Sequence, residues 1–253
     1  MCRQANRSPR LAIVTSRRSN AVVTPNTPPR PPGPPHNPGL RDLVEGKQQW
    51  SPPLEPGAVR QGFRNWHERG YLPHRDAPGL TQFVTFRLAD SLPVALRSEW
   101  EHLLHLDDPA QSHAELQAYL DRGRGGCCLR TPEIAGIVEE ALLFFHHQRY
   151  ELRAWVVMPN HVHVLFKTGE TPMSDVVASW KKHTGAKANR RLGRRGSFWE
   201  ADYWDTYMRD AAHELQTRRY IENNPASAGL VRDPPEWRWG SARRRDGFGE
   251  LKL

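Results

Sequence analysis

The sequence has 253 residues, enough for one large domain or two small ones, with 38% hydrophobic residues and a mean hydropathy of −0.73. That hydropathy is low for a globular protein of this length, which indicates that part of the chain does not pack into a core. The net charge of +8 is uneven, because residues 1–60 hold nine Lys or Arg and three Asp or Glu, which leaves only +2 for the remainder. The high pI is therefore no argument by itself that a folded domain binds nucleic acid.

Cysteine content and hydropathy argue against a disulfide-rich protein and against a membrane-spanning one. Cys2, Cys127 and Cys128 form neither a disulfide framework nor a C-x-x-C pair, so the chain fits a reducing compartment. No run approaches 18 apolar residues, so we predict no membrane span.

Residues 1–60 are predicted to be a disordered tail rich in Pro and Arg. Eleven of the 22 prolines lie between Ala21 and Arg60, a composition that favours extended polyproline conformation without a core. A mis-assigned start codon, a linker and a nonspecific DNA tether are all compatible with this segment.

Strand and helix patterns begin after the tail. Thr81–Leu88 alternates in the manner of a strand, and Pro93 opens a helical region that contains Trp100. Pro132 begins a second predicted helix, which ends near Gln148.

The segment Ala154–Phe166 reads as a hairpin, because two apolar β-favouring runs flank the turn residues Pro159 and Asn160. In the second strand His161 and His163 face one way, about 7 Å apart at the backbone, and could bind one cation. The alternative is two ordinary strand histidines that meet water or a backbone carbonyl.

A basic helix is predicted over Met173–Leu192. Seven basic residues fall in residues 173–198 against one acid, Asp175: Lys181, Lys182, Lys187, Arg190, Arg191, Arg194 and Arg195. Such a one-sided cluster is a candidate contact for a nucleic-acid backbone, and the alternative is a solvated helix face.

Phe198–Met208 is predicted to be extended, and Asp210 to cap a helix that stops near Asn223 because of Pro225. Within that helix Tyr220 and Asn224 are four residues apart and share a face. The two imidazoles and the amide oxygen could bind a divalent ion, and the nearby phenol could then attack a phosphodiester. The alternative is that Tyr220 merely packs and Asn224 ends the helix.

Several motifs in order resemble one family. W-V-V-M-P-N-H-V-H-V-L, the basic helix, F-W-E-x-D-Y, R-Y-I-E-N-N-P-A-S-A-G-L-V and W-R-W-G-S-A-R are similar to the REP-associated tyrosine transposases, which are single-tyrosine members of the HUH (His-hydrophobic-His) endonuclease superfamily. The resemblance covers roughly Trp66 to Arg244. Arg75 stands where an aromatic residue is expected, and Ala226-Ser227 replace a common Val-Lys, which removes a phosphate contact.

The resemblance implies an α+β fold, a ferredoxin-like antiparallel sheet with helices packed against it, over residues 61–245, followed by a C-terminal tail at 246–253. It implies Tyr220 as nucleophile, in preference to Tyr203 and Tyr207, and a metal site of His161, His163 and Asn224 for Mg²⁺ or Mn²⁺. The implied substrate is single-stranded DNA, folded into hairpins with palindromic repeats and cleaved through a 5′-phosphotyrosine.

The expected activity is therefore that of a metal-dependent endonuclease and strand transferase in the bacterial cytoplasm, associated with the nucleoid. An alternative is a domesticated hairpin-DNA-binding protein with a regulatory or structural role. The sequence leaves open whether the protein is a monomer or a homodimer.

Overall fold

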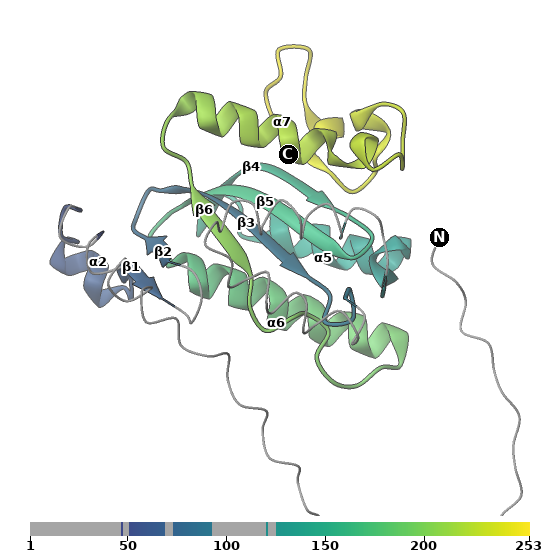
Figure 1. Cartoon of the computed structure of the whole chain (residues 1–253), viewed down its shortest axis with the longest axis horizontal. Coiled ribbons are helices and arrows are strands. Elements are labelled where there is room, and N and C mark those ends of the chain that lie inside the picture. The colour runs from purple at the N-terminus through teal and green to yellow at the C-terminus, as the bar shows by residue number, and fades with distance from the viewer. Residues whose placement is uncertain (1–46, 48–50, 69–72, 93–119, 121–124) are drawn as a thin grey trace, which may run out of the picture.

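The computed structural model describes residues 47, 51–68, 73–92, 120 and 125–253 (Figure 1). Most of the predicted N-terminal tail and the helical region predicted after Pro93 therefore lie outside the described residues. The elements are α2 (Pro56–Arg60), β1 (Asn65–Glu68), β2 (Pro73–Asp76), β3 (Thr81–Arg87), η1 (Cys128–Arg130), α5 (Pro132–Phe144), β4 (Tyr150–Val157), β5 (His161–Thr168), α6 (Met173–Leu192), β6 (Trp204–Tyr207), α7 (Ala211–Ser227), η2 (Pro234–Glu236) and η3 (Ser241–Arg244).

The central sheet has four antiparallel strands in the order β4-β5-β3-β6, and β1 and β2 form a separate two-stranded sheet. Helix α5 precedes β4, and α6 connects β5 to β6. This order and connectivity are those of a ferredoxin-like fold, so the predicted α+β class is confirmed. The predicted hairpin is also present, with β4 starting at Tyr150, earlier than the sequence pattern suggested.

One face of the sheet is covered by α5 and α6, and the other by α7 (Figure 1). The larger core lies on the α5 and α6 side, where Val162, Val164 and Phe166 are fully buried as predicted. A smaller core lies under α7 and includes Phe83, Leu165 and Ile221. Alternation along β5 thus directs its odd-numbered residues toward α7.

The predicted end of the last helix is wrong, because α7 continues through Pro225 to Ser227. A proline removes one hydrogen bond from a helix, and here it does so in the final turn, where few bonds follow. Ala228 N still donates to Asn224 O at 2.9 Å, and Pro225 is itself buried. Asn224 therefore remains helical. The end of helix α5 is closer to its prediction, because α5 ends at Phe144, a few residues before the predicted Gln148.

The chain after α7 folds back on the domain. Trp155 N donates to Ser241 Oγ at 3.1 Å, and Trp239 packs against the larger core. Residues 245–252 form a small loop in which Lys252 N donates to Arg244 O at 2.8 Å. Within the described residues, no helix combines the length and apolar character that crossing a membrane requires.

Candidate active site

The two histidines of β5 lie side by side on the α7 face of the sheet. Both have 0% exposure, and His161 Nε2 is 3.1 Å from His163 Nε2. The shared face predicted from the strand period is confirmed. Two imidazole nitrogens directed at each other form a donor pair of the kind that holds a divalent ion.

Two further polar side chains contact the other ring nitrogens. Asn160 Oδ1 is 2.8 Å from His161 Nδ1, and Thr85 Oγ1 is 2.8 Å from His163 Nδ1. Thr85 lies directly opposite His163 in the β3–β5 register. Neither Asn160 nor Thr85 was predicted from the sequence to belong to the site. The signal for Thr85 was available, because it alternates on β3 with the residues of the other core.

Tyr220 reaches the histidines from α7. Its ring centroid is 5.5 Å from that of His163 and 6.1 Å from that of Phe83, and the residue is 39% exposed. Helix α7 begins as predicted, with Asp210 Oδ1 accepting from His213 N at 2.7 Å. The phenol therefore borders solvent on one side and the histidine pair on the other.

Asn224 lies one helical turn after Tyr220 and is 3% exposed. Its Oδ1 is buried and accepts no hydrogen bond from any residue that the structure describes. Such an oxygen destabilises the fold unless a ligand satisfies it. Two imidazoles and an amide oxygen suit a divalent cation, although the described residues contain no cluster of three or more His, Cys, Asp or Glu of the kind that holds a metal. The observed donor atoms thus fit the metal predicted from the sequence.

Helix α7 is fixed to the C-terminal segment through Glu222. Its Oε1 accepts from Ser241 Oγ at 2.7 Å and from Arg245 Nε at 2.7 Å. Arg245 also donates to Arg153 O of β4 at 2.7 Å. These bonds hold the helix that carries Tyr220, and no sequence pattern predicted them.

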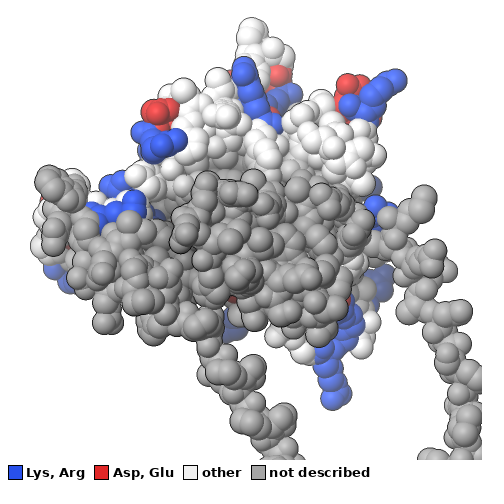
Figure 2. Space-filling model, viewed as in Figure 1, with Lys and Arg blue, Asp and Glu red and all other residues white. Residues whose placement is uncertain are grey.

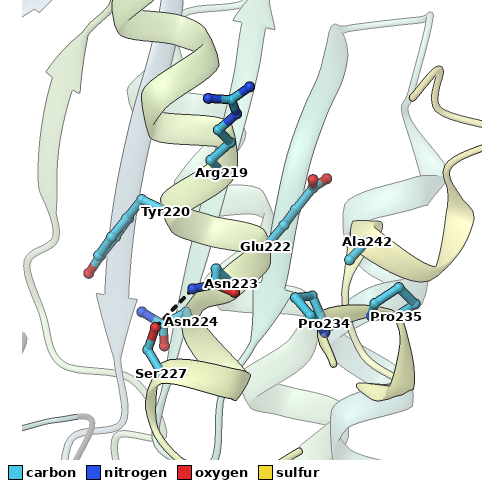
Figure 3. A pocket seen from close by; sticks show the side chains of 9 residues that line it. All are labelled: Arg219, Tyr220, Glu222, Asn223, Asn224, Ser227, Pro234, Pro235 and Ala242. Atoms are coloured by element: carbon cyan, nitrogen blue, oxygen red, sulfur yellow. Dashed lines mark hydrogen bonds between the residues drawn. The ribbon is translucent and has the colours of Figure 1, made fainter. Parts of the chain in front are cut away.

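A pocket of about 690 Å³ borders the predicted nucleophile (Figure 3). Residues of α7, η2 and η3 line it: Arg219, Tyr220, Glu222, Asn223, Asn224, Ser227, Pro234, Pro235 and Ala242. Asn223 Nδ2 donates to Ser227 Oγ at 3.1 Å along its wall. The pocket is large enough for part of a nucleotide beside the phenol.

The basic helix does not join this site. The predicted helix Met173–Leu192 is confirmed as α6, but it covers the face of the sheet opposite to α7. Arg191 and Arg194 form ion pairs with Glu133 and Asp90, at 3.7 and 2.9 Å. In Figure 2 basic side chains project both from the α6 edge and from the α7 edge of the molecule.

The two competing tyrosines lie elsewhere. The ring of Tyr207 contacts Trp66 at 5.7 Å between centroids, and the Arg75 guanidinium lies 4.7 Å from its centroid. Lys181 Nζ lies 5.7 Å from the ring of the buried Tyr203. Tyr220, in contrast, packs its ring against His163 of the histidine pair.

Comparison with known families places this site in context. Residues 134–224 match the family model described as "Transposase IS200 like". The matched segment runs from α5 to Asn224 and contains both histidines and Tyr220.

Two solved structures are similar to the chain at low identity. One, a REP-associated tyrosine transposase bound to a REP hairpin, is 19% identical with a TM-score of 0.41, covering 70% of this chain and 82% of its own. The other, from Deinococcus radiodurans R1 and described as a transposase, is 18% identical with a TM-score of 0.26, covering 62% and 96%. Among curated proteins, none matches the sequence.

Proposed function

We propose that the protein is a metal-dependent endonuclease and strand transferase of single-stranded DNA that works through a 5′-phosphotyrosine. The observation that carries the proposal is the contact between Tyr220 and His163, together with the unsatisfied Oδ1 of Asn224. The family match over the same residues supports it. The hairpin form of the substrate, with palindromic repeats, follows from the sequence resemblance alone, as does action at the nucleoid.

His161, His163 and Asn224 would hold Mg²⁺ or Mn²⁺. When bound, the ion supplies Lewis-acid polarisation of the scissile phosphate and lowers the cost of ionising a nearby phenol. The Tyr220 oxygen forms a bond to phosphorus while the bond to the 3′ oxygen breaks, and the phenol proton leaves to solvent as the 3′ oxygen gains one. The reverse attack by a 3′-hydroxyl on the phosphotyrosine rejoins strands without ATP.

Access to the histidines requires a local change. Both imidazoles have 0% exposure, and the Tyr220 ring packs against His163. A phosphate reaches the pair only if the phenol ring turns or α7 shifts. The exposed side of Tyr220 and the adjacent pocket give the ring and a nucleotide room for this movement.

The test is an adduct assay with the full chain, Mn²⁺ and a labelled hairpin oligonucleotide taken from palindromic repeats that flank the gene. We expect a covalent DNA–protein adduct that survives denaturation, no adduct with Tyr220→Phe, and unchanged DNA binding by that variant. Tyr207→Phe is the matched control and should form the adduct.

A free 5′-phosphate without any adduct would overturn the proposed mechanism. Tight hairpin binding without cleavage would instead favour the alternative, a DNA-binding protein with a regulatory or structural role.

A further inference from the structure

We infer that Asn160 and Thr85 are positioning residues that set the protonated nitrogen of each active-site histidine, in an inference that rests on the proposed function. Asn160, His161 and His163 have 0% exposure, and Thr85 has 5%. Water therefore competes little for the bonds among them, and the direction of each bond is decided by the side chains themselves.

Asn160 fixes His161. Asn160 Nδ2 donates to Leu120 O at 3.0 Å, and a backbone carbonyl can only accept, so the amide oxygen must be the atom that faces His161. An amide oxygen also only accepts. The proton of a neutral His161 is therefore on Nδ1, and its Nε2 keeps a lone pair directed at His163.

The same logic then determines His163. The two Nε2 atoms are 3.1 Å apart, and a hydrogen bond between them needs one proton. Because His161 Nε2 is the acceptor, His163 Nε2 must be the donor of this hydrogen bond when both rings are neutral. His163 Nδ1 then accepts from the Thr85 hydroxyl at 2.8 Å. All four bonds run in one direction, from Thr85 to Leu120.

The two histidines are consequently not equivalent as ligands. His161 already presents a lone pair at Nε2, whereas His163 has a proton there. To present its own lone pair, His163 must lose the Nε2 proton and gain one at Nδ1, with no change in the proton count of the ring. A hydroxyl can both donate and accept, so Thr85 can reverse from donor to acceptor and satisfy either form. Thr85 is thus the adaptable partner and Asn160 the fixed one.

Nitrogen-15 NMR of histidine-labelled, full-length protein tests this directly, because it reports which ring nitrogen is protonated. In metal-free protein, at a pH where both rings are neutral, we expect His161 with the proton on Nδ1 and His163 with the proton on Nε2. Saturating Mg²⁺ should move the His163 proton to Nδ1 and leave the His161 form unchanged.

Variants of Thr85 provide the second readout. Thr85→Val has nearly the same shape but no hydroxyl, and we expect Mn²⁺ affinity, measured by calorimetry, to fall about 10- to 100-fold. Thr85→Ser keeps the hydroxyl and should bind Mn²⁺ within a few fold of the wild type. A metal-free His163 protonated on Nδ1, or wild-type Mn²⁺ affinity in Thr85→Val, overturns the inference.

These readouts are separable from the proposed function. The expected NMR forms in a protein that makes no adduct would support the hydrogen-bond chain and count against the nuclease alone. Adduct formation in a protein whose histidines show the opposite forms would overturn the inference alone.

Discussion

The phenol ring of Tyr220 packs against the imidazole of His163, with their planes at 60° and their centroids 5.5 Å apart. This contact joins α7 to β5, two elements that cover and form the same face of the sheet. Phe83 adds a second ring contact to Tyr220, at 6.1 Å. Apolar and aromatic contacts of this kind therefore set the position of the Tyr220 ring.

Replacing Asn224 separates metal binding from folding. In Asn224→Ala the buried, unpartnered oxygen disappears, which relieves about 1–3 kcal/mol and offsets the lost packing. We expect the metal-free protein to keep its unfolding free energy within about 1 kcal/mol. Stabilisation by saturating Mn²⁺ should fall by about 1.4 kcal/mol for each tenfold loss of affinity, as measured by thermal unfolding. The control is Asn223→Ala, since Asn223 is exposed; equal Mn²⁺ stabilisation in both variants would exclude Asn224 as a ligand.

The Glu222–Arg245 ion pair should stabilise the position of α7. Both side chains are largely buried, at 14% and 13% exposure, so Arg245→Met leaves a carboxylate without its main partner. We expect a loss of about 3 kcal/mol in urea unfolding and slower adduct formation. Arg232→Met removes an ion pair from a side chain that is 87% exposed, and should cost no more than about 1 kcal/mol. Similar losses in the two variants would contradict this role of Arg245.

Asp76 should make stability depend on pH. Burial raises the pKa of Asp76 from 3.8 to about 6, with smaller contributions that include repulsion from Asp205, although Met173 N donates to it at 3.1 Å. Because the folded state holds the proton more tightly, this contribution is complete below about pH 4 and is lost as pH rises through about 6.

Asp76→Asn removes the charge that burial disfavours. We expect the variant to match the wild type near pH 4 and to be about 1–3 kcal/mol more stable at neutral pH, by urea unfolding. A difference of the same size at both values would show that the amide acts through packing or hydrogen bonding and not through charge.

The basic surface of α6 remains a predicted DNA contact on the face away from Tyr220. Lys182 and Arg190 are exposed there, so we expect Lys182→Gln with Arg190→Gln to lower the salt dependence of single-stranded DNA binding, with a slope smaller by about 1.4. Arg232→Gln with Lys252→Gln removes the same charge from the C-terminal segment and is the control. The reverse ranking of the two double variants would place the DNA on the α7 face alone.

Local patterns in the sequence predicted much of the fold. The two-residue period of β5 is enough to separate the histidine face from Val162, Val164 and Phe166, and the cap at Asp210 marks the start of α7. Both signals act within a few residues. The shared face of Tyr220 and Asn224 was predictable for the same reason, because the two residues are one turn apart on one helix.

Features that depend on distant contacts were not predictable. The tendency of the residue before a proline to avoid helical backbone angles is a local effect. In α7 it is outweighed by burial of Ile221 and Pro225 against the sheet. The bonds of Glu222 to Ser241 and Arg245 join segments whose proximity only the folded chain creates. Alternation on β3 indicates the face on which Thr85 lies, but the register that sets it opposite His163 depends on a distant strand.

The turn at Pro159 and Asn160 is held by backbone bonds from three sides. Leu88 N donates to Asn160 O at 2.9 Å, Leu129 N to Pro159 O at 3.2 Å, and Met158 N to His161 O at 2.9 Å. Hairpin turns usually accept extra residues, but one added residue here would rotate His161 and His163 to the opposite face of the sheet. An insertion at this connection should therefore abolish formation of the DNA adduct, even though the connection lies between two strands at the end of a hairpin.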